Sequence, residues 1–193
     1  METLNVRITG VTPLLMHSAR GANPLDPMTK AHKQLTSKRK KTDDDHEAIA
    51  RSEWRMGLYY NEQSGVYLPT MNIRASLIAG AKFNKLGMAV KRSTILTESE
   101  SPLQYDGPRD PDGLFDDGRF VNCMAVGVGK ARLMRTRPIF PEWKLDFELV
   151  YVEDQIERDQ LLQAFENAGK LIGLGDFRPE CGGSFGRYKV EVT

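Results

Sequence analysis

Cysteine is nearly absent from the 193-residue sequence, which contains only Cys123 and Cys181, far apart in the chain. Neither belongs to a CxxC pair or lies near a histidine, so the sequence encodes no disulfide scaffold and no zinc site. A reducing cytoplasm is the expected compartment. No hydrophobic run is long enough to cross a bilayer, and the first residues alternate polar and apolar types, unlike a signal peptide.

Catalytic and nucleotide-binding signatures are also missing. No Gly-Lys-Ser or Gly-Lys-Thr occurs, which excludes a nucleotide-triphosphate P-loop. Only three histidines are present, His17, His32 and His46, all in the first quarter of the chain and without metal-ligand spacing. No Ser/His/Asp or Cys/His arrangement is visible. We therefore expect a protein that is not an enzyme and holds no metal or cofactor, with His17 in a structural role.

The net charge is only +1, from 27 lysines and arginines against 26 aspartates and glutamates. This balance argues against bulk attraction to nucleic acid, but the charges are unevenly distributed. Residues 30–41 contain basic side chains and no acid. The cations that end this block are Lys38, Arg39, Lys40 and Lys41. They suit a phosphate backbone, or equally a solvated loop balanced by the three aspartates at 43–45.

The hydrophobic pattern predicts one domain over residues 1–193 with alternating strands and helices. Strict alternation predicts strands, and apolar residues at helical spacing predict helices. The expected units are strands near 4–8, 66–69, 120–128, 143–151 and 188–192, and helices near 71–81 and 154–172. Residues 120–128 are apolar on both faces, which is typical of a central strand. This order predicts an α+β, ferredoxin-like (RRM-like) palm, an antiparallel sheet with helices on one face.

Two insertions interrupt this pattern. The basic insertion at 18–62 contains Pro and Gly residues and then a helix over about 43–60, with aspartates at the positive end of that helix. The segment 101–119 is rich in Pro, Gly and Asp and is expected to be an acidic loop with little structure of its own.

A second group of cations falls within eight residues, namely Lys130, Arg132, Arg135 and Arg137. On a regular strand, the even-numbered Lys130 and Arg132 would point to one face and the odd-numbered Arg135 and Arg137 to the other. The alternation therefore slips around Leu133 and Met134, which predicts a bulge. Cations with interposed apolar side chains fit a groove for single-stranded nucleic acid. The alternative is structural, because cations on an edge strand also discourage aggregation.

The densest glycine segment lies near the C-terminus, between a helix and the last strand. Its glycines are Gly173, Gly175, Gly182, Gly183 and Gly186. Glycine admits positive φ and close approach, so this loop is expected to be shaped for contact; the alternative is a long, awkward helix-to-strand connection. Phe177 and Phe185 are candidates for stacking on bases, although Phe185 could equally fill the core. Nearby phosphate-binding candidates are Arg178 and Arg187, with Arg74 on the helix near 71–81.

Three segments resemble the repeat-associated mysterious protein (RAMP) superfamily, which contains backbone and repeat-processing subunits of CRISPR complexes. They are the opening strand with Thr12-Pro-Leu-Leu-Met-His17, the segment Leu68-Pro-Thr-Met-Asn-Ile-Arg-Ala-Ser-Leu77, and the glycine loop Gly173–Tyr188. The second is similar to that superfamily's IPGSSLKGALR segment. The chain looks most like the backbone type and also resembles phage-encoded proteins, which suggests a stand-alone viral or prophage member.

This resemblance implies a palm that binds single-stranded RNA, or single-stranded DNA in a phage setting, with little sequence preference. It also implies copies that stack head to tail, with an extended thumb formed by the 18–45 insertion or the 101–119 loop. Two other functions stay open. One is a repeat-RNA endoribonuclease with His17 or His46 as general base, and the other is a phage-encoded decoy that enters a host CRISPR complex.

Overall fold

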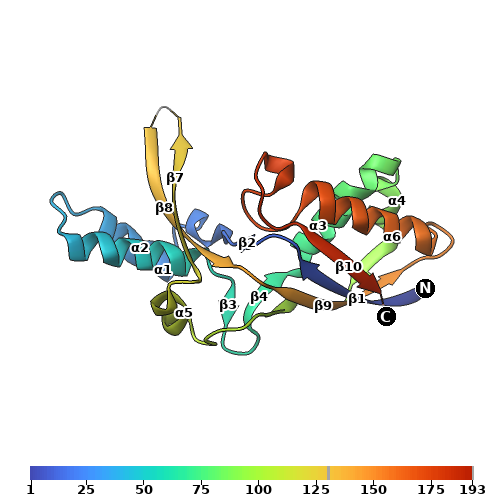
Figure 1. Cartoon of the computed structure of the whole chain (residues 1–193), viewed down its shortest axis with the longest axis horizontal. Coiled ribbons are helices and arrows are strands. Elements are labelled where there is room, and N and C mark those ends of the chain that lie inside the picture. The colour runs from blue at the N-terminus through green and yellow to red at the C-terminus, as the bar shows by residue number, and fades with distance from the viewer. Residues whose placement is uncertain (130, 193) are drawn as a thin grey trace.

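The computed structural model describes residues 1–129 and 131–192, and its strands form two antiparallel sheets (Figure 1). The larger sheet contains β1 (Glu2–Gly10), β3 (Tyr60–Asn61), β4 (Gly65–Pro69), β5 (Thr94–Leu96), β6 (Glu100–Gln104), β9 (Lys144–Tyr151) and β10 (Tyr188–Val192). Its strand order is β10-β1-β9-β6-β4-β3, and β5 also pairs with β9. The smaller sheet has the order β2-β8-β7, with β2 (Leu14–Leu15), β7 (Val121–Val128) and β8 (Ala131–Phe140). The chain is thus a mixed α+β protein.

The centre of the larger sheet is the pairing of β1 with β9, which runs from Glu2↔Tyr151 to Thr9↔Lys144. Alternate residues of β1 are buried, because side chains on a strand point to opposite faces and only one face meets the core. Leu4, Val6 and Ile8 occupy that face. The alternation read in the sequence therefore corresponds to the buried side of this sheet.

Helices cover one face of the larger sheet (Figure 1). They are α3 (Thr70–Ala81), the short turn η2 (Lys82–Asn84), α4 (Gly87–Ser93), α6 (Arg158–Asn167) and the π-helical turn η3 (Ala168–Ile172). Ile73 and Leu77 of α3 and Leu161 and Phe165 of α6 are fully buried. Because α3 carries Gly80 at its contact with α6, the two backbones approach closely there.

Two of the connections between the two sheets pass Trp143. The chain passes from β1 to β2 and from β8 to β9 at this corner, and Trp143 is 2% exposed. Its indole Nε1–H donates to the Thr12 carbonyl at 2.9 Å, and its own carbonyl accepts from Gly10 N–H at 2.9 Å. Gly10 has no Cβ, and one placed there would lie 2.3 Å from the indole ring. The corner thus sets how the smaller sheet leaves the larger one.

The 18–62 insertion forms a helical arm that extends from the body beside the smaller sheet (Figure 1). It contains the turn η1 (Ala19–Ala22), α1 (Pro27–Thr36) and α2 (Asp43–Gly57), and α2 packs against β8. The helix expected over about 43–60 is α2. Thr42 caps it reciprocally with Asp45, and the three aspartates lie in its first turn. Trp54 anchors α2 in the core and donates to the Phe120 carbonyl at 2.8 Å.

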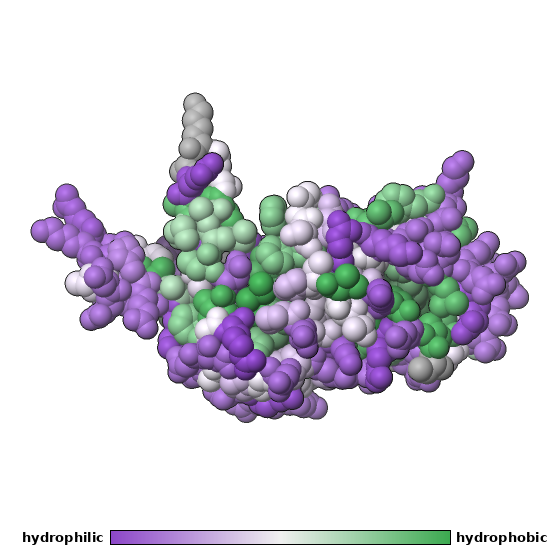
Figure 2. Space-filling view, viewed as in Figure 1, coloured by the Kyte–Doolittle hydropathy of each residue, from purple (hydrophilic) through white to green (hydrophobic). Residues whose placement is uncertain are grey.

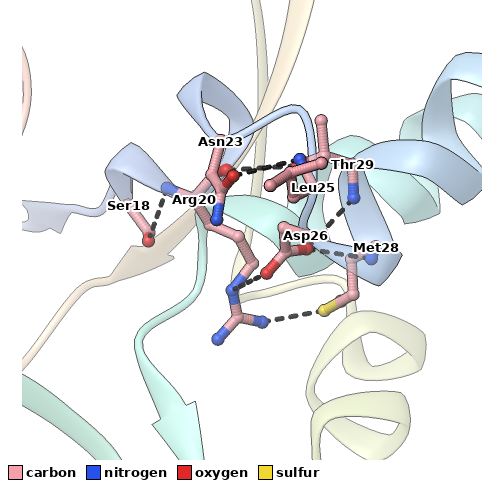
Figure 3. A network of polar contacts seen from close by, with 7 residues as sticks. All are labelled: Ser18, Arg20, Asn23, Leu25, Asp26, Met28 and Thr29. Atoms are coloured by element: carbon pink, nitrogen blue, oxygen red, sulfur yellow. Dashed lines mark hydrogen bonds and ion pairs between the residues drawn. The ribbon is translucent and has the colours of Figure 1, made fainter.

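A local polar network shapes the entry to the arm (Figure 3). Asp26 accepts from the backbone N–H groups of Met28 and Thr29 and so caps α1, whose first residue is Pro27. The same carboxylate lies 3.7 Å from the Arg20 guanidinium. These contacts order a segment that is rich in Gly and Pro. The helix that follows it, α1, contains no buried residue.

The segment 101–119 is not the unstructured acidic loop expected from its composition. Most of β6 falls in it, and so does α5 (Pro111–Asp117), which Asp110 caps with a 2.7 Å hydrogen bond to Gly113 N–H. Phe115 packs edge-on against Trp54 at 5.5 Å between ring centroids. Proline and aspartate thus start a short helix here because they occupy its first turn and cap.

The strands β7 and β8 form a hairpin that projects away from the body (Figure 1). They pair in unbroken register from Val121↔Pro138 to Val128↔Ala131, so the bulge expected around Leu133 and Met134 is absent from this pairing. The prediction of a central strand at 120–128 is also wrong. Strand β7 lies at the edge of its sheet, because β8 is the one described strand that pairs with it, and its residues 121–127 are exposed or half-buried.

None of the described helices is long and apolar enough to span a membrane.

We predict that Gly80→Ala destabilises the fold. A Cβ at position 80 would lie 2.4 Å from the Ala164 carbonyl oxygen and 2.6 Å from Ala168 N. The clash should outweigh the better helix propensity of alanine and lower the free energy of unfolding by about 2 kcal/mol, as measured by urea denaturation. Gly21→Ala is the control, because nothing lies within 4 Å of a Cβ there. Equal urea midpoints for the two variants would show that α3 and α6 are not in close contact.

Candidate nucleic-acid interface

A hollow of about 940 Å³ lies between the hairpin, the arm and the glycine loop. Its lining combines apolar, aromatic and ionisable side chains from segments far apart in sequence. The principal ones are His17, His32, Glu53, Met124, Arg135, Arg137, Asp176 and Phe177. Figure 2 shows apolar surface over the projecting hairpin that forms one wall.

Two arginines of β8 enter this hollow, and each is paired with a carboxylate. Arg135 donates to Glu53 of α2 at 2.8 Å, and Glu53 also accepts from Thr136 N–H at 3.0 Å. Arg137 donates to Asp176 of the glycine loop, and its side chain is only 15% exposed. The expectation of four cations lining one trough is therefore not met. Arg132 lies on the opposite face of β8 by strand alternation, and Lys130 lies outside the described residues.

His17 lies where this hollow meets a second one. The second hollow, of about 570 Å³, lies between α3 and the glycine loop and shares His17 and Asp176 with the first. Desolvation, followed by the charge of Arg137, lowers the pKa of His17, and Asp176 acts in the opposite direction. Desolvation also lowers the pKa of His32, whose Nδ1 lies 3.0 Å from Ser52 Oγ. Both imidazoles are thus favoured in the neutral form at pH 7.

The glycines of the glycine loop are required by its contacts with the rest of the protein. Gly175 has φ of 76°, and a Cβ there would lie 2.3 Å from the Leu15 carbonyl oxygen of β2. Gly186 has φ of 70° and donates to the Pro13 carbonyl at 2.8 Å. Asp176 N–H in turn donates to Leu15 O at 2.7 Å. Glycine is needed because the loop lies directly on β2, which holds Asp176 and its neighbour Phe177 at the hollow.

The two candidate stacking residues differ in position. Phe177 is 45% exposed, lines the hollow and has an unusual positive φ of 46°. Phe185 is half-buried beside it, with ring centroids 6.3 Å apart. Tyr188 fills the core, as a residue on the apolar side of the last strand should. The Tyr188 hydroxyl oxygen lies 3.0 Å from Ser76 Oγ, and burial raises the pKa of this hydroxyl. Only Phe177 therefore presents a ring to a ligand in the hollow.

The other arginine candidates are held by the protein itself. Arg178 lies at the second hollow, pairs with Glu180 at 2.6 Å and donates to the Gly175 carbonyl at 3.1 Å. Arg187 donates to the Lys170 carbonyl, and Arg74 donates to the carbonyls of Thr94 and Lys91. These bonds place Arg74 and Arg187 in structural roles apart from the first hollow.

The cations that end the basic block, residues 38–41, lie in the turn between α1 and α2, at the far end of the arm (Figure 1). Lys38 pairs with Asp45 at 2.5 Å, and Lys41 donates to the Lys38 carbonyl at 2.7 Å. Within residues 1–129 and 131–192, no side-chain partner is found for Arg39 or Lys40. These two cations project from the arm instead of joining the hollow.

Glu53, Asp176, His32 and Met124 are site residues that sequence reasoning did not select. Asp176 carried a signal, because it is the acid inside the glycine loop, whereas Glu53 sits in a helix full of charged residues and has no distinguishing pattern. Among the described residues, no group of three or more His, Cys, Asp and Glu is placed to hold a metal ion. The site offers hydrogen-bond donors, an exposed ring and neutral imidazoles.

No family model matches the chain, and no curated protein has a matching sequence.

We predict that Arg137→Gln raises the pKa of His17, as followed by NMR titration of the imidazole protons. In the native protein this pKa lies below 6.5, and removing the guanidinium removes a charge that disfavours the imidazolium. Since the folded-state pKa is lowered, His17 contributes stability above pH 6.5 that is lost as the pH falls towards the folded-state value. An unchanged or lower pKa in the variant would mean that Arg137 does not act on His17.

Proposed function

We infer that this protein binds single-stranded nucleic acid without catalysis and assembles head to tail along the bound strand, as a RAMP-like backbone subunit would. The sheet order β10-β1-β9-β5 supports this family. The chain order β1-α3-β5-β9-α6-β10 around it is a βαββαβ pattern with both helices on one face, as in ferredoxin-like (RRM-like) palms. The two exposed, free cysteines suit a reducing cytoplasm.

The observation that carries the proposal is the hollow between the hairpin, the arm and the glycine loop. It is open to solvent, it presents Phe177 from the glycine loop, and it receives Arg135 and Arg137 from β8. A flat exposed ring beside guanidinium groups is the combination that holds bases and phosphates without reading sequence. The apolar Met124 and Val126 of β7 lie on the same face of the hairpin as Arg135, since Met124 is its cross-strand partner, and they add surface for unstacked bases.

The ion pairs determine how these arginines act. A guanidinium has five N–H donors, and Arg135 and Arg137 each use one on a carboxylate. The remaining donors can reach a phosphate oxygen, while Glu53 and Asp176 fix the orientation of the side chains. Because the carboxylates cancel much of the positive charge, binding should depend on contacts and stacking more than on bulk electrostatic attraction.

The head-to-tail part of the proposal uses the α1–α2 arm as the thumb. The arm extends beyond the palm and carries Arg39 and Lys40 at its tip (Figure 1). A tip on one copy that meets the palm of the next is a heterologous contact, which produces an open helical row of copies. The strand would pass along the aligned hollows.

We predict that Arg135→Gln/Arg137→Gln weakens binding of a fluorescent single-stranded oligonucleotide by about tenfold, since two phosphate contacts lose their charge. The native protein should bind RNA or DNA strands of mixed sequence similarly. Its salt dependence should be shallow, with a slope near −1 to −2 in log–log form, as expected for about two or three phosphates. Fluorescence anisotropy measures both quantities.

The matched control is Arg7→Gln. Arg7 also pairs with a carboxylate, Asp146 at 2.7 Å, but lies on the open face of the larger sheet. The Arg7→Gln variant should bind the oligonucleotide as the native protein does. An equal loss of oligonucleotide binding in the two variants would refute the proposal. So would a native protein that shows no binding of the oligonucleotide by anisotropy and in electron micrographs.

The position of His17 favours one second candidate, an endoribonuclease. A neutral imidazole at the junction of two hollows, beside Arg137 and Asp176, is suited to accept a 2′-hydroxyl proton. His46 is exposed in the first turn of α2 and does not line either hollow among the described residues.

If the protein is a ribonuclease, incubation with hairpin RNA should yield cleavage products that His17→Ala abolishes and His46→Ala leaves unchanged. The principal proposal expects no product from any of the three proteins. Products that persist in His17→Ala would exclude His17 as the base.

A further inference from the structure

Strand β7 is a long sheet edge without a partner in the described structure. It spans Val121–Val128, pairs with β8 on one side only, and makes extensive contact with no other element. The hairpin that contains it projects into solvent (Figure 1). An open edge presents backbone N–H and C=O groups that can pair with another strand.

The register shows which backbone groups face outward. In an antiparallel pair, hydrogen-bonded and non-hydrogen-bonded residue pairs alternate. Pro138 has no N–H, so Val121↔Pro138 is a non-hydrogen-bonded pair, and the bond from Ile139 N to Phe120 O at 3.0 Å fits this phase. By alternation, the N–H and C=O groups of Cys123, Ala125 and Gly127 point away from β8. All three residues are exposed.

At the opposite edge of the same sheet, outward backbone groups of β8 have partners within the protein. The outward N–H of Thr136 on β8 donates to Glu53, and the Pro138 carbonyl accepts from Met16 N–H at 2.8 Å. β2 pairs with the base of β8, and α2 packs beside it. For β7, no partner of Cys123, Ala125 or Gly127 backbone groups is found within the described residues. The protein thus covers one edge of this sheet and leaves the other open.

β7 also lacks the features that normally protect an edge. Its sequence, Val-Asn-Cys-Met-Ala-Val-Gly-Val, contains no charged residue and no proline. By contrast, the open edge of the larger sheet, β10, carries the exposed Lys189 and Glu191. When a strand pairs with itself across a two-fold axis, any charge near the axis meets its own copy. An uncharged strand avoids this repulsion, so β7 is suited to pair with β7 of a second copy.

Strand β8, next to this edge strand, also carries exposed apolar side chains. Met134, opposite Ala125 on β8, is 61% exposed, and Leu133, opposite Val126, is 43% exposed. Because β7 runs towards the hairpin tip, antiparallel pairing directs each tip towards the base of the other hairpin.

We propose that two copies of this protein associate through antiparallel pairing of their β7 edges, which joins two hairpins into a four-stranded sheet β8-β7-β7-β8. The contact is two-fold and closes a dimer. It is therefore distinct from the head-to-tail contact of the proposed function, and it requires no nucleic acid.

The first test is Ala125→Pro, with Ala125→Val as the matched control. Proline removes the outward N–H and leaves the bonds to β8 intact, whereas valine keeps the donor. The two-fold axis doubles the loss, so Ala125→Pro should weaken dimerisation by about tenfold or more in sedimentation velocity without nucleic acid. Ala125→Val should dimerise as the native protein does. A monomeric native protein at micromolar concentration, or equal dimerisation of both variants, would overturn the proposal.

The second test does not depend on the folding of the proline variant. Single cysteines are placed in turn at positions 121–127 in a Cys123→Ser/Cys181→Ser background, and disulfide formation under mild oxidation is followed. Two-fold pairing brings a residue opposite its own copy only near the axis, where the Cα atoms approach about 4.5–5.5 Å. Fast cross-linking should therefore peak at one or two neighbouring positions.

The control position is Arg132→Cys, on β8 and away from the edge. Uniform cross-linking along β7, or cross-linking as fast from position 132, would indicate random collision and overturn the proposal. So would cross-links that require a second cysteine in β10, because they would show a heterologous edge contact. Oligonucleotide binding by the Ala125→Pro variant distinguishes the two proposals. The proposed function expects this binding to persist even when the variant no longer dimerises.

Discussion

The corner at Trp143 is the constraint on which the rest of the arrangement depends. Two connections between the sheets, β1 to β2 and β8 to β9, pass there, and the indole lies over Gly10, where any other residue would clash. Its hydrogen bond to the Thr12 carbonyl fixes the start of β2, and β2 in turn supports the glycine loop. The direction of the hairpin and the position of Asp176 therefore follow from one buried side chain.

The hollow that results is closed by ion pairs instead of being lined by unpaired cations. Arg137–Asp176 joins the hairpin to the palm, and Arg135–Glu53 joins it to the arm. Partly buried arginines next to carboxylates bind ligands through oriented donors, whereas solvated lysines act as mobile point charges. The net charge of +1 agrees with the proposal that shape and donor geometry, more than bulk charge, would decide what this site binds.

Much of the fold could be predicted from the sequence, because its signals are local. The alternation in β1 and β9, the helix after Thr42 and the buried face of α3 all follow from periodicity and capping. The structure of segment 101–119 was missed because Pro111 and Asp110 read as loop residues, although they also start helices. The edge position of β7 was missed because apolar residues on both faces are typical of a central strand.

The sequence by itself determined the elements and the apolar core, since strand and helix periods are written in consecutive residues. It also placed cations, glycines and Phe177 in candidate segments. Only the tertiary structure decided which carboxylate each arginine meets, that β8 pairs with β7 without the expected bulge, and that β7 is left without a second neighbour in the described structure. These depend on contacts between residues tens of positions apart, such as Arg135 with Glu53, and no local pattern encodes them.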